Sequence, residues 1–520
     1  MASGASPAVG GPAPTSKDEA TAGNQRGAEE SVTVPQPVDY TELYERIKDK
    51  PCRVVQINQQ LEGFNGGAFR TRSDMIEREL ESIHNAQTLS EVHEELDAAG
   101  RRLKQLGVFN KVEFFAHEEP LDDPSACTVD VRLEEANWYK VRAATYVEDS
   151  ERTLELGASM SNALGNAEHL GANFEYGTEN SHTASVSFRQ PRAMGLPLLL
   201  ELRGSQLFRN NQKASSYTEQ LRGAVLGLKS LSGVHSLEYE LGWRRLLDPS
   251  RSASRAVVAQ MGDYLKSSVR YTAAADRRDV SAGGAAAALG GAGWGVKSTT
   301  EVAGLVPPSV GAGGGGSGPD STLRFVRQQV DAVANVPMDD TGAVVFSLGV
   351  SAGLLLPWGE GGMSRPSCIA DRFFLGGPSS LRGFKFKGAG PSDARRPAPG
   401  RSASEQALAS GRRDALGGDA FTSIFASLMF QLPHPALKLM NLHGHAFVNG
   451  GNVIQLLGTG RPPAALLSEF GSTFRWSCGA GLVVPTPLGR FEANYCVLMS
   501  AAEHDRVRRG LQLGFAASNL

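Results

Sequence analysis

From residue 139 to the C-terminus, hydrophobic and polar positions alternate with a period of two residues. In the last segment, Leu511, Leu513 and Phe515 fall on one face, and small or polar residues fall between them. The same alternation recurs in 237–243, 344–350, 472–484 and 491–497. A period of two indicates β-strands with one apolar face. We therefore expect a mainly β structure over this part of the chain.

Such strands build either a sandwich, with the apolar faces in a core, or a transmembrane barrel, with the apolar faces toward lipid. About 380 residues, less two long insertions, leave room for roughly 16 strands with their turns. An even number of strands can close without an unpaired backbone edge, as a bilayer requires. The pattern therefore favours an antiparallel barrel of about 16 strands, with a sandwich as the alternative.

The segment before the barrel has a different, mixed pattern. A β-branched run at Val54–Ile57 is followed by helical periodicity over 71–83 and again over 92–106. Two strand-like runs follow at Val112–Phe115 and Thr128–Leu133. We expect a compact α+β module over 50–136, with the element order strand, helix, helix, strand, strand.

Three further segments lack both patterns and are rich in Gly, Ala, Pro, Ser or Arg: 1–45, 281–319 and 388–418. Segments of low hydrophobicity cannot compensate the entropy lost on ordering, so we expect 1–45 to be a disordered tail. The other two are expected to be long loops outside any compact core. They interrupt the barrel domain, which we assign to 138–520.

Composition excludes several classes of protein. The chain has 520 residues, 41% hydrophobic and 21% charged, with a formal net charge of -3. Its densest apolar run, near 196–202, is far shorter than the ~20 residues of a membrane-spanning helix. The near-neutral charge predicts no nucleic-acid partner. Five widely spaced cysteines without a Cys-x-x-Cys pair argue against a disulfide scaffold or a cysteine zinc site.

Candidate chemistry is sparse. Gly311, Gly313 and Gly316 match a dinucleotide-binding fingerprint, but no strand precedes them and no helix follows. His443 and His445 share one strand face without an evident third metal ligand. No nucleophile triad or catalytic carboxylate pair is recognisable. We expect no enzymatic activity, no cofactor and no metal.

One segment carries more information: residues 371–384, with the sequence DRFFLGGPSSLRGF, here called the signature loop. Taken alone, it is a glycine-dense turn with one arginine flanked by aromatic residues. It resembles the signature loop of the outer-membrane-protein assembly superfamily, whose bacterial member is BamA. The resemblance is strongest to the barrel subunits of the mitochondrial sorting and assembly machinery (SAM).

Three later runs support this resemblance, at 447–452, 475–481 and 492–497. The module at 50–136 is similar to a single POTRA domain, in the position that the family pattern expects. The resemblance implies a protein that inserts β-barrel precursors into the mitochondrial outer membrane, with its POTRA domain in the intermembrane space. The implied partners are precursor proteins, the lipid bilayer and accessory SAM subunits. A chloroplast-envelope or secretion-type pore of the same superfamily, or a passive porin, is the alternative.

The resemblance also assigns site residues. In the signature loop these are Gly376, Gly377, Leu381, Arg382, Gly383 and Phe384. The loop is expected to fold into the barrel lumen, where the guanidinium of Arg382 needs a partner; Asp419 and Asn449 are the candidates.

The barrel seam should join a first strand at 139–148 to a last strand at 508–520. That last strand matches the signal carried by precursor terminal strands, through Arg508, Gly510, Leu513 and Phe515. Exchange of one such strand for another at the seam needs no covalent chemistry.

Overall fold

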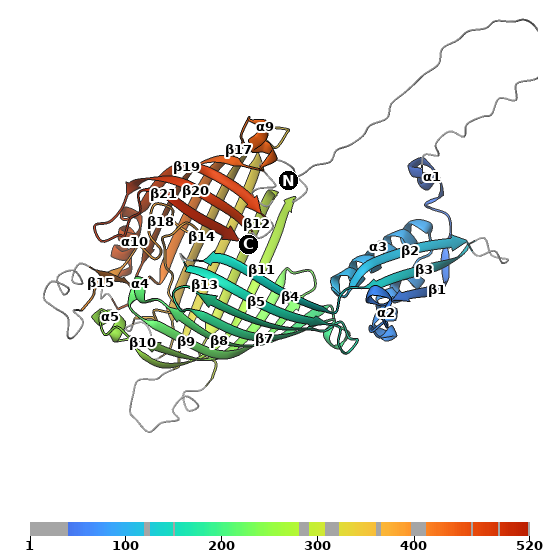
Figure 1. Ribbon diagram of the computed structural model, residues 1–520, viewed down its shortest axis with the longest axis horizontal. Helices are drawn as coiled ribbons and strands as arrows, with labels where there is room; N and C mark the ends of the chain where they lie inside the picture. Colours follow the sequence, from blue (N-terminus) through green and yellow to red (C-terminus); the bar gives the residue numbers. More distant parts are fainter. Residues whose placement is uncertain are drawn as a thin grey trace, which may run out of the picture.

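The computed structural model describes residues 40–118, 125–148, 151–279, 291–306, 322–359, 366–396, 412–458, 461–486 and 489–517. It contains an N-terminal module joined to a large curved sheet (Figure 1). No helix in these ranges is long and apolar enough to cross a membrane.

The N-terminal module, residues 53–135, is a three-stranded sheet covered by helices. Its strands β1 (Arg53–Glu62), β2 (Phe109–Glu118) and β3 (Ala126–Glu135) lie in the order β1-β3-β2. β1 runs parallel and β2 antiparallel to the central β3. The helical segments are η1 (Phe64–Gly66), α2 (Ser73–Leu80), η2 (Glu81–Asn85) and α3 (Leu89–Gln105). The observed element order is the one that the periodicity predicted.

The module has its own hydrophobic core. Ile76 of α2, Leu103 of α3 and Val131 of β3 are fully buried in it. The helix α3 begins where the Thr88 hydroxyl accepts a hydrogen bond from the backbone N–H of Glu91, which is an N-cap.

The barrel wall is one antiparallel sheet of 16 strands. They are β4 (Tyr139–Glu148), β5 (Glu151–Ser161), β6 (His169–Gly177), β7 (His182–Pro191), β8 (Leu198–Asn210), β9 (Thr218–Ser230), β10 (His235–Leu247), β11 (Gly262–Asp279), β12 (Ala292–Ala303), β13 (Phe325–Pro337), β14 (Val344–Pro357), β17 (Ala420–Gln431), β18 (His443–Ile454), β19 (Arg475–Thr486), β20 (Gly489–Ser500) and β21 (Gly510–Ala517). A single curved sheet of 16 strands agrees with the barrel that the alternation favoured and excludes the two packed sheets of a sandwich.

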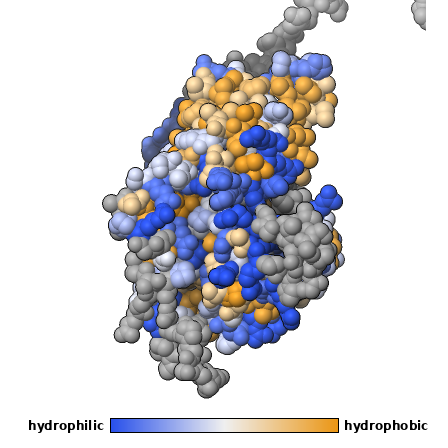
Figure 2. Space-filling model, turned by 90° about the vertical axis from the view of Figure 1, so that its left-hand side faces the viewer, coloured by the Kyte–Doolittle hydropathy of each residue, from blue (hydrophilic) through white to orange (hydrophobic). Residues whose placement is uncertain are grey.

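The apolar face of the wall points outward. Leu156, Leu241 and Trp243 are between 43% and 49% exposed, whereas charged residues such as Glu301 are buried on the inner face. Outward apolar and inward polar residues are typical of a membrane barrel. Figure 2 looks at the end opposite the module, where polar residues gather across the middle and apolar residues on the wall above.

The connections between strands differ at the two ends of the barrel. Between strands, the module end carries η3 (Ala193–Gly195) and α9 (Pro435–Leu439); the opposite end carries α4 (Gln212–Ser215), α5 (Arg255–Val258), α10 (Pro463–Ser472) and the small ladder of β15 (Ser392–Ala394) with β16 (Arg413–Ala415). The signature loop enters the barrel from this opposite end.

The structure corrects three expected boundaries. Residues 40–47 form the helix α1 (Tyr40–Ile47) instead of tail, because Tyr40, Tyr44 and Ile47 recur at helical spacing. The expected loop 281–319 contains β12. In this strand Trp294 and Val296 alternate with small or polar residues, but the glycine-rich flanks indicated a loop. The last strand begins at Gly510 and not at residue 508.

The expected loop 388–418 lies only partly outside the core. Ala389, Ala415 and Leu416 at its two ends are buried, and β15 and β16 pair within it. Its middle, 397–411, lies outside the described residues, as do 1–39, 281–290 and 307–321 with the glycine fingerprint at 311–316.

Candidate functional site

The signature loop is buried within the barrel. Leu381 and Phe384 are fully buried, and Arg382 is 5% exposed. The backbone of the loop turns back on itself, since Gly377 and Leu381 exchange N–H···O hydrogen bonds of 3.2 and 3.1 Å. Gly376 has a φ of +116°, and a Cβ there would lie 2.5 Å from the carbonyl oxygen of Lys385. The turn therefore requires glycine at this position.

Arg382 forms a buried ion pair with Glu492 of β20. Its Nε and Nη2 atoms lie 3.1 and 2.6 Å from Glu492 Oε2. The guanidinium also lies over the rings of Phe425 and Phe447, at 4.3 and 5.3 Å from their centroids. Asn494 donates a 2.9 Å hydrogen bond to the same carboxylate oxygen. Such pairs are charge-assisted and hold the arginine in one direction.

The prediction that Asp419 is the partner of this guanidinium is wrong. Asp419 instead accepts hydrogen bonds from the backbone N–H groups of Leu456 and Leu457, at 3.0 and 3.2 Å, and from the Ser367 hydroxyl. It fastens the connection after β18, where those backbone donors would otherwise be unsatisfied.

Asn449 contacts the backbone of Arg382 and not its guanidinium. With its amide turned to satisfy both neighbours, the oxygen accepts from the Arg382 N–H at 2.7 Å and the nitrogen donates to Ser477 Oγ at 2.7 Å. Ser477 Oγ also donates to the Arg382 carbonyl oxygen, at 2.5 Å. Strands β18 and β19 therefore hold the backbone of the loop while β20 holds its charge.

The signature loop is also fastened to the opposite wall. Asp371 at its start forms a 2.8 Å ion pair with Arg244 of β10, which also lies 2.9 Å from Glu219 of β9. All three side chains are at least 95% buried. The loop therefore spans the lumen between two buried ion pairs.

Beyond Arg382, the chain pairs with the segment that leads into the last strand. The Arg508 N–H donates to the Gly383 carbonyl, and the Lys385 N–H donates to the Arg506 carbonyl, both at 2.8 Å. Gln512 of β21 receives a 3.0 Å hydrogen bond from the Gly383 N–H through its Oε1 atom. The signature loop thus binds directly to β21 and to the residues before it.

Strand β21 is an edge of the sheet, and β4 is the other edge. In the described part of the chain, no ladder joins the two strands, although some of their Cα atoms approach within 8 Å. Gly510 opens β21 opposite Cys496, and Leu513 and Phe515 lie opposite Ala493 and Phe491.

Two of the four residues that match the precursor signal differ in their surroundings. Leu513 is 67% exposed on the outer face, while Arg508 precedes the strand and belongs to the segment paired with the loop.

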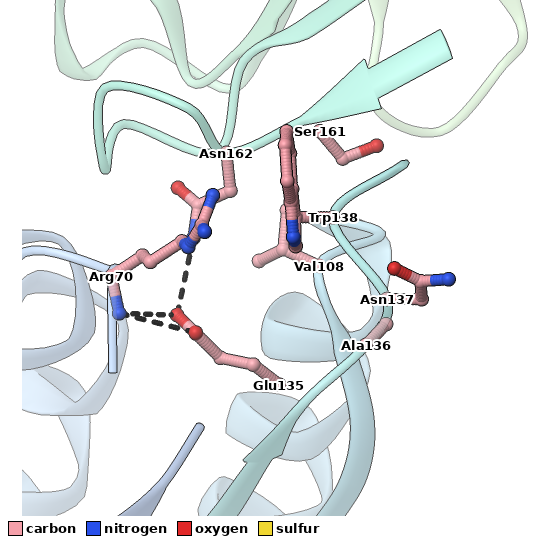
Figure 3. A pocket seen from close by; sticks show the side chains of 8 residues that line it. All are labelled: Arg70, Val108, Glu135, Ala136, Asn137, Trp138, Ser161 and Asn162. Carbon is pink, nitrogen blue, oxygen red and sulfur yellow. Dashed lines mark hydrogen bonds between the residues drawn. The ribbon is translucent and has the colours of Figure 1, made fainter. Parts of the chain in front are cut away.

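A second set of contacts fixes the N-terminal module to the barrel (Figure 3). The buried carboxylate of Glu135 accepts hydrogen bonds from the N–H groups of Arg70 and Thr71, from the Thr71 hydroxyl and from Asn162 Nδ2, at 2.6–3.2 Å. Asn162 belongs to the turn between β5 and β6. The Arg70 guanidinium stacks on Trp138 at 4.4 Å. Three of these donors belong to the module itself, and Asn162 is the donor that joins Glu135 to the barrel.

A salt bridge reinforces this junction. Glu79 of α2, 3% exposed, lies 2.7 Å from Arg192 in the turn before β8. His169 of β6 contacts the Leu106 carbonyl through Nε2, at 3.1 Å.

No group of three His, Cys, Asp or Glu side chains suited to a metal ion occurs among the residues that the structure describes. His443 contacts the Asn441 carbonyl, and His445 contacts Asn494 Oδ1 at 2.6 Å.

Sequence reasoning missed Glu492, Gln512, Asp371 and Arg244 as contacts of the loop. Glu492 and Gln512 do carry a signal, because each is a polar residue on the inward face of an alternating strand.

Comparison with known proteins identifies the family of this chain. The Omp85 superfamily domain matches residues 162–518. Sorting and assembly machinery component 50 homolog B of Xenopus laevis is 30% identical to this chain, over 86% of this chain and 88% of its own length. The human homolog is likewise 30% identical, over 86% of this chain and 87% of its own length.

Among solved structures, BamA from Haemophilus ducreyi lacking POTRA domains 1-3 has a TM-score of 0.65, at 16% identity. The match covers 89% of this chain and 84% of that one, and it shows a shared fold. From the domain match and the relatives together, this chain belongs to the Omp85 superfamily and, within it, to the family of sorting and assembly machinery component 50 proteins.

Proposed function

We propose that this protein assembles β-barrel precursors into the mitochondrial outer membrane by offering the edges of β4 and β21 as templates. The observation that carries the proposal is the absence of a β4–β21 ladder within the described residues. A strand that enters a bilayer must have its backbone hydrogen bonds satisfied, and an unpaired edge can satisfy them. Addition of a precursor strand to such an edge is β-augmentation.

The signature loop regulates how readily the edge strand β21 is released. It binds β21 through Gln512 and the segment before β21 through backbone hydrogen bonds. A precursor strand that resembles β21 would compete for the same neighbours. We infer that displacement of β21 and rearrangement of the loop occur together, and that completed barrels leave when β21 returns. No covalent step or cofactor is part of this proposal.

The N-terminal module is proposed to be a POTRA domain that receives precursors in the intermembrane space. Its fixed junction at Glu135 supports this role, because the module then has a defined direction relative to the barrel mouth. Accessory SAM subunits are proposed as partners from the names of the relatives.

The alternative functions predict a different lumen or a different location for the protein. A passive porin needs an open channel, whereas here Leu375, Leu381 and Phe384 form a buried cluster within the barrel. A chloroplast-envelope or secretion-type pore of the same superfamily would share the loop. Alkaline carbonate extraction of fractionated cells with organelle markers separates the mitochondrial location from a chloroplast-envelope one, and the proposed function requires the protein in the membrane pellet of mitochondria.

A photo-reactive side chain on an edge strand tests the mechanism. We would place it at Val141 of β4, which is 81% exposed, and, as a matched control, at Val186 of the interior strand β7, which is 62% exposed. During assembly of a β-barrel precursor, light should produce an adduct with the precursor's last strand at position 141 and not at 186. Equal labelling at both positions would exclude templating by β4.

A further inference from the structure

Two cysteines of the N-terminal module lie in contact. Cys52 immediately precedes β1, and Cys127 is on the central strand β3. Their Sγ atoms are 3.1 Å apart, and both are free thiols. In a disulfide the sulfurs are about 2.05 Å apart, so the two thiols are about 1 Å from bonding distance.

The backbone places both thiols on the same face of the sheet. Val54 lies opposite Cys127 in the parallel ladder, and both of these side chains are buried. Cys52 has the same parity as Val54 along the chain, so it points to the same face. The Cys52 N–H donates to the Gln87 carbonyl at 2.9 Å, which fixes its position. The approach of the sulfurs is therefore set by the strand register.

We propose that Cys52 and Cys127 are a thiol–disulfide site, closed by a small-molecule disulfide such as oxidised glutathione and reopened by excess thiol. The Cys52 thiolate attacks one sulfur of the oxidant, which leaves a mixed disulfide on Cys52 and releases one thiolate. The Cys127 thiolate then attacks the Cys52 sulfur and releases the second. Two protein thiols lose two electrons and two protons, and the oxidant becomes two thiols.

The environments of the two sulfurs assign the order of attack. Burial, together with the hydrogen bond to Cys52, raises the pKa of the Cys127 thiol to about 12. Cys52 is only partly buried and can meet an oxidant from solvent, whereas Cys127 is 6% exposed. Cys52 is therefore the residue that reacts first, since the attacking species is an accessible thiolate.

The bond would secure the N-terminal border of the module. Residues 48–52, which follow α1, are held by the backbone bonds of Ser90 N–H to the Lys48 carbonyl and of Leu89 N–H to the Lys50 carbonyl, at 2.9 and 3.1 Å. A Cys52–Cys127 disulfide ties this segment covalently to the central strand. The inference does not depend on the proposed function, because it concerns the chemistry of the module alone.

Peptide mapping tests the site in the full-length protein purified in detergent. After reduction and exposure to oxidised glutathione, free thiols are alkylated and the protein is digested with trypsin without reductant. Cleavage after Lys48, Arg53, Lys111 and Arg132 should give one species that joins peptide 49–53 to peptide 112–132. Thiol titration should show the loss of two of the five thiols, and dithiothreitol should restore both.

Variants distinguish this bond from other oxidation. In Cys52→Ser and in Cys127→Ala the linked peptide should disappear, and Cys127→Ala should retain a glutathione adduct on Cys52. Cys478→Ser, in the barrel, should leave the linked peptide unchanged. Each variant is first checked for heat-modifiable mobility to confirm a folded barrel. Recovery of all five thiols, or a stable Cys52 adduct in the unsubstituted chain, would overturn the proposal.

Discussion

At the scale of single residues, the buried charges in the lumen determine how the signature loop is held. Arg382 and Glu492 have side chains only 6% and 3% exposed. A charge buried to this extent is stable only with its partner present, so each member fixes the position of the other.

Arg382→Ala should destabilise the folded barrel by up to about 3–5 kcal/mol, because the buried Glu492 carboxylate loses one of its two described ion-pair partners. The other partner, Arg490, lies 2.8 Å from Glu492 Oε1 and offsets part of this loss. The measurement is the temperature at which heat-modifiable mobility is lost in detergent, together with precursor assembly in isolated membranes. Arg142→Ala is the matched control. Its side chain is 66% exposed and pairs with Glu155, so its removal should change stability by at most about 1 kcal/mol.

The double variant Arg382→Ala/Glu492→Ala completes the test. If the pair acts as a unit, the double variant should lose less stability than the two single variants taken together. Equal effects of Arg382→Ala and Arg142→Ala would contradict the role of the pair.

Gly376→Ala should weaken the turn of the signature loop, since the added Cβ would lie 2.5 Å from the Lys385 carbonyl oxygen. Gly233→Ala provides the comparison: its φ is also positive, at +74°, but nothing lies within 4 Å of the added atom. Both variants carry a backbone penalty on the order of 1 kcal/mol, and only Gly376→Ala adds the clash. We expect faster proteolysis within the loop for Gly376→Ala alone.

At the scale of elements, β21 depends on two supports of different kinds. On one side it has the ladder to β20; inside the barrel it has the side chain of Gln512 bonded to the signature loop. An edge strand with few partners exchanges its backbone amides faster than an interior strand. The loop contact therefore sets how readily β21 leaves.

Gln512→Ala should increase amide hydrogen exchange across β21 by about fivefold, as expected for the loss of a hydrogen bond worth about 1 kcal/mol. Gln328→Ala is the control on the interior strand β13, where Gln328 donates a 2.9 Å hydrogen bond to Ser298. Its removal should leave exchange in β21 unchanged. Exchange in β21 that is insensitive to Gln512→Ala would show that the loop does not hold the strand.

The elements themselves were largely predictable, and the contacts between them were not. Alternation along 491–497 and 510–517 identifies strands and their inward face, since side chains point to opposite sides in turn. That Arg382 meets Glu492 depends on the depth of the loop in the barrel, which no local pattern encodes. The strand β12 was missed because its glycine-rich flanks suggested a loop, although Trp294 and Val296 alternate within it.

At the scale of the whole molecule, the direction of the N-terminal module depends on a small set of buried groups. Glu135 accepts from Arg70, Thr71 and Asn162, and Glu79 pairs with Arg192. Through Asn162 and Arg192, these groups connect the module to the turns after β5 and β7. A module held in this way presents its sheet edges in a constant position relative to the barrel mouth.

Glu135→Ala should release the module from this position. The substitution leaves several buried donors without an acceptor, at a penalty of about 1–3 kcal/mol for each buried group that stays unsatisfied. We expect the distance distribution between spin labels at Lys111 and Met338 to broaden in double electron–electron resonance, with the labels introduced as unnatural amino acids. Met338 is 63% exposed at the module end of β13, so a label there should not disturb packing.

Glu134→Ala is the control, because this neighbouring carboxylate is not part of the junction; within the described part of the chain it accepts a 3.5 Å hydrogen bond from Asn110. It should leave the distribution narrow. If Glu135→Ala also leaves it narrow, the ion pair between Glu79 and Arg192 is the next contact to remove, and Arg192→Ala in the same background should then broaden the distribution. If the module stays fixed in that double variant, the direction of the module is set by packing and not by these buried polar groups.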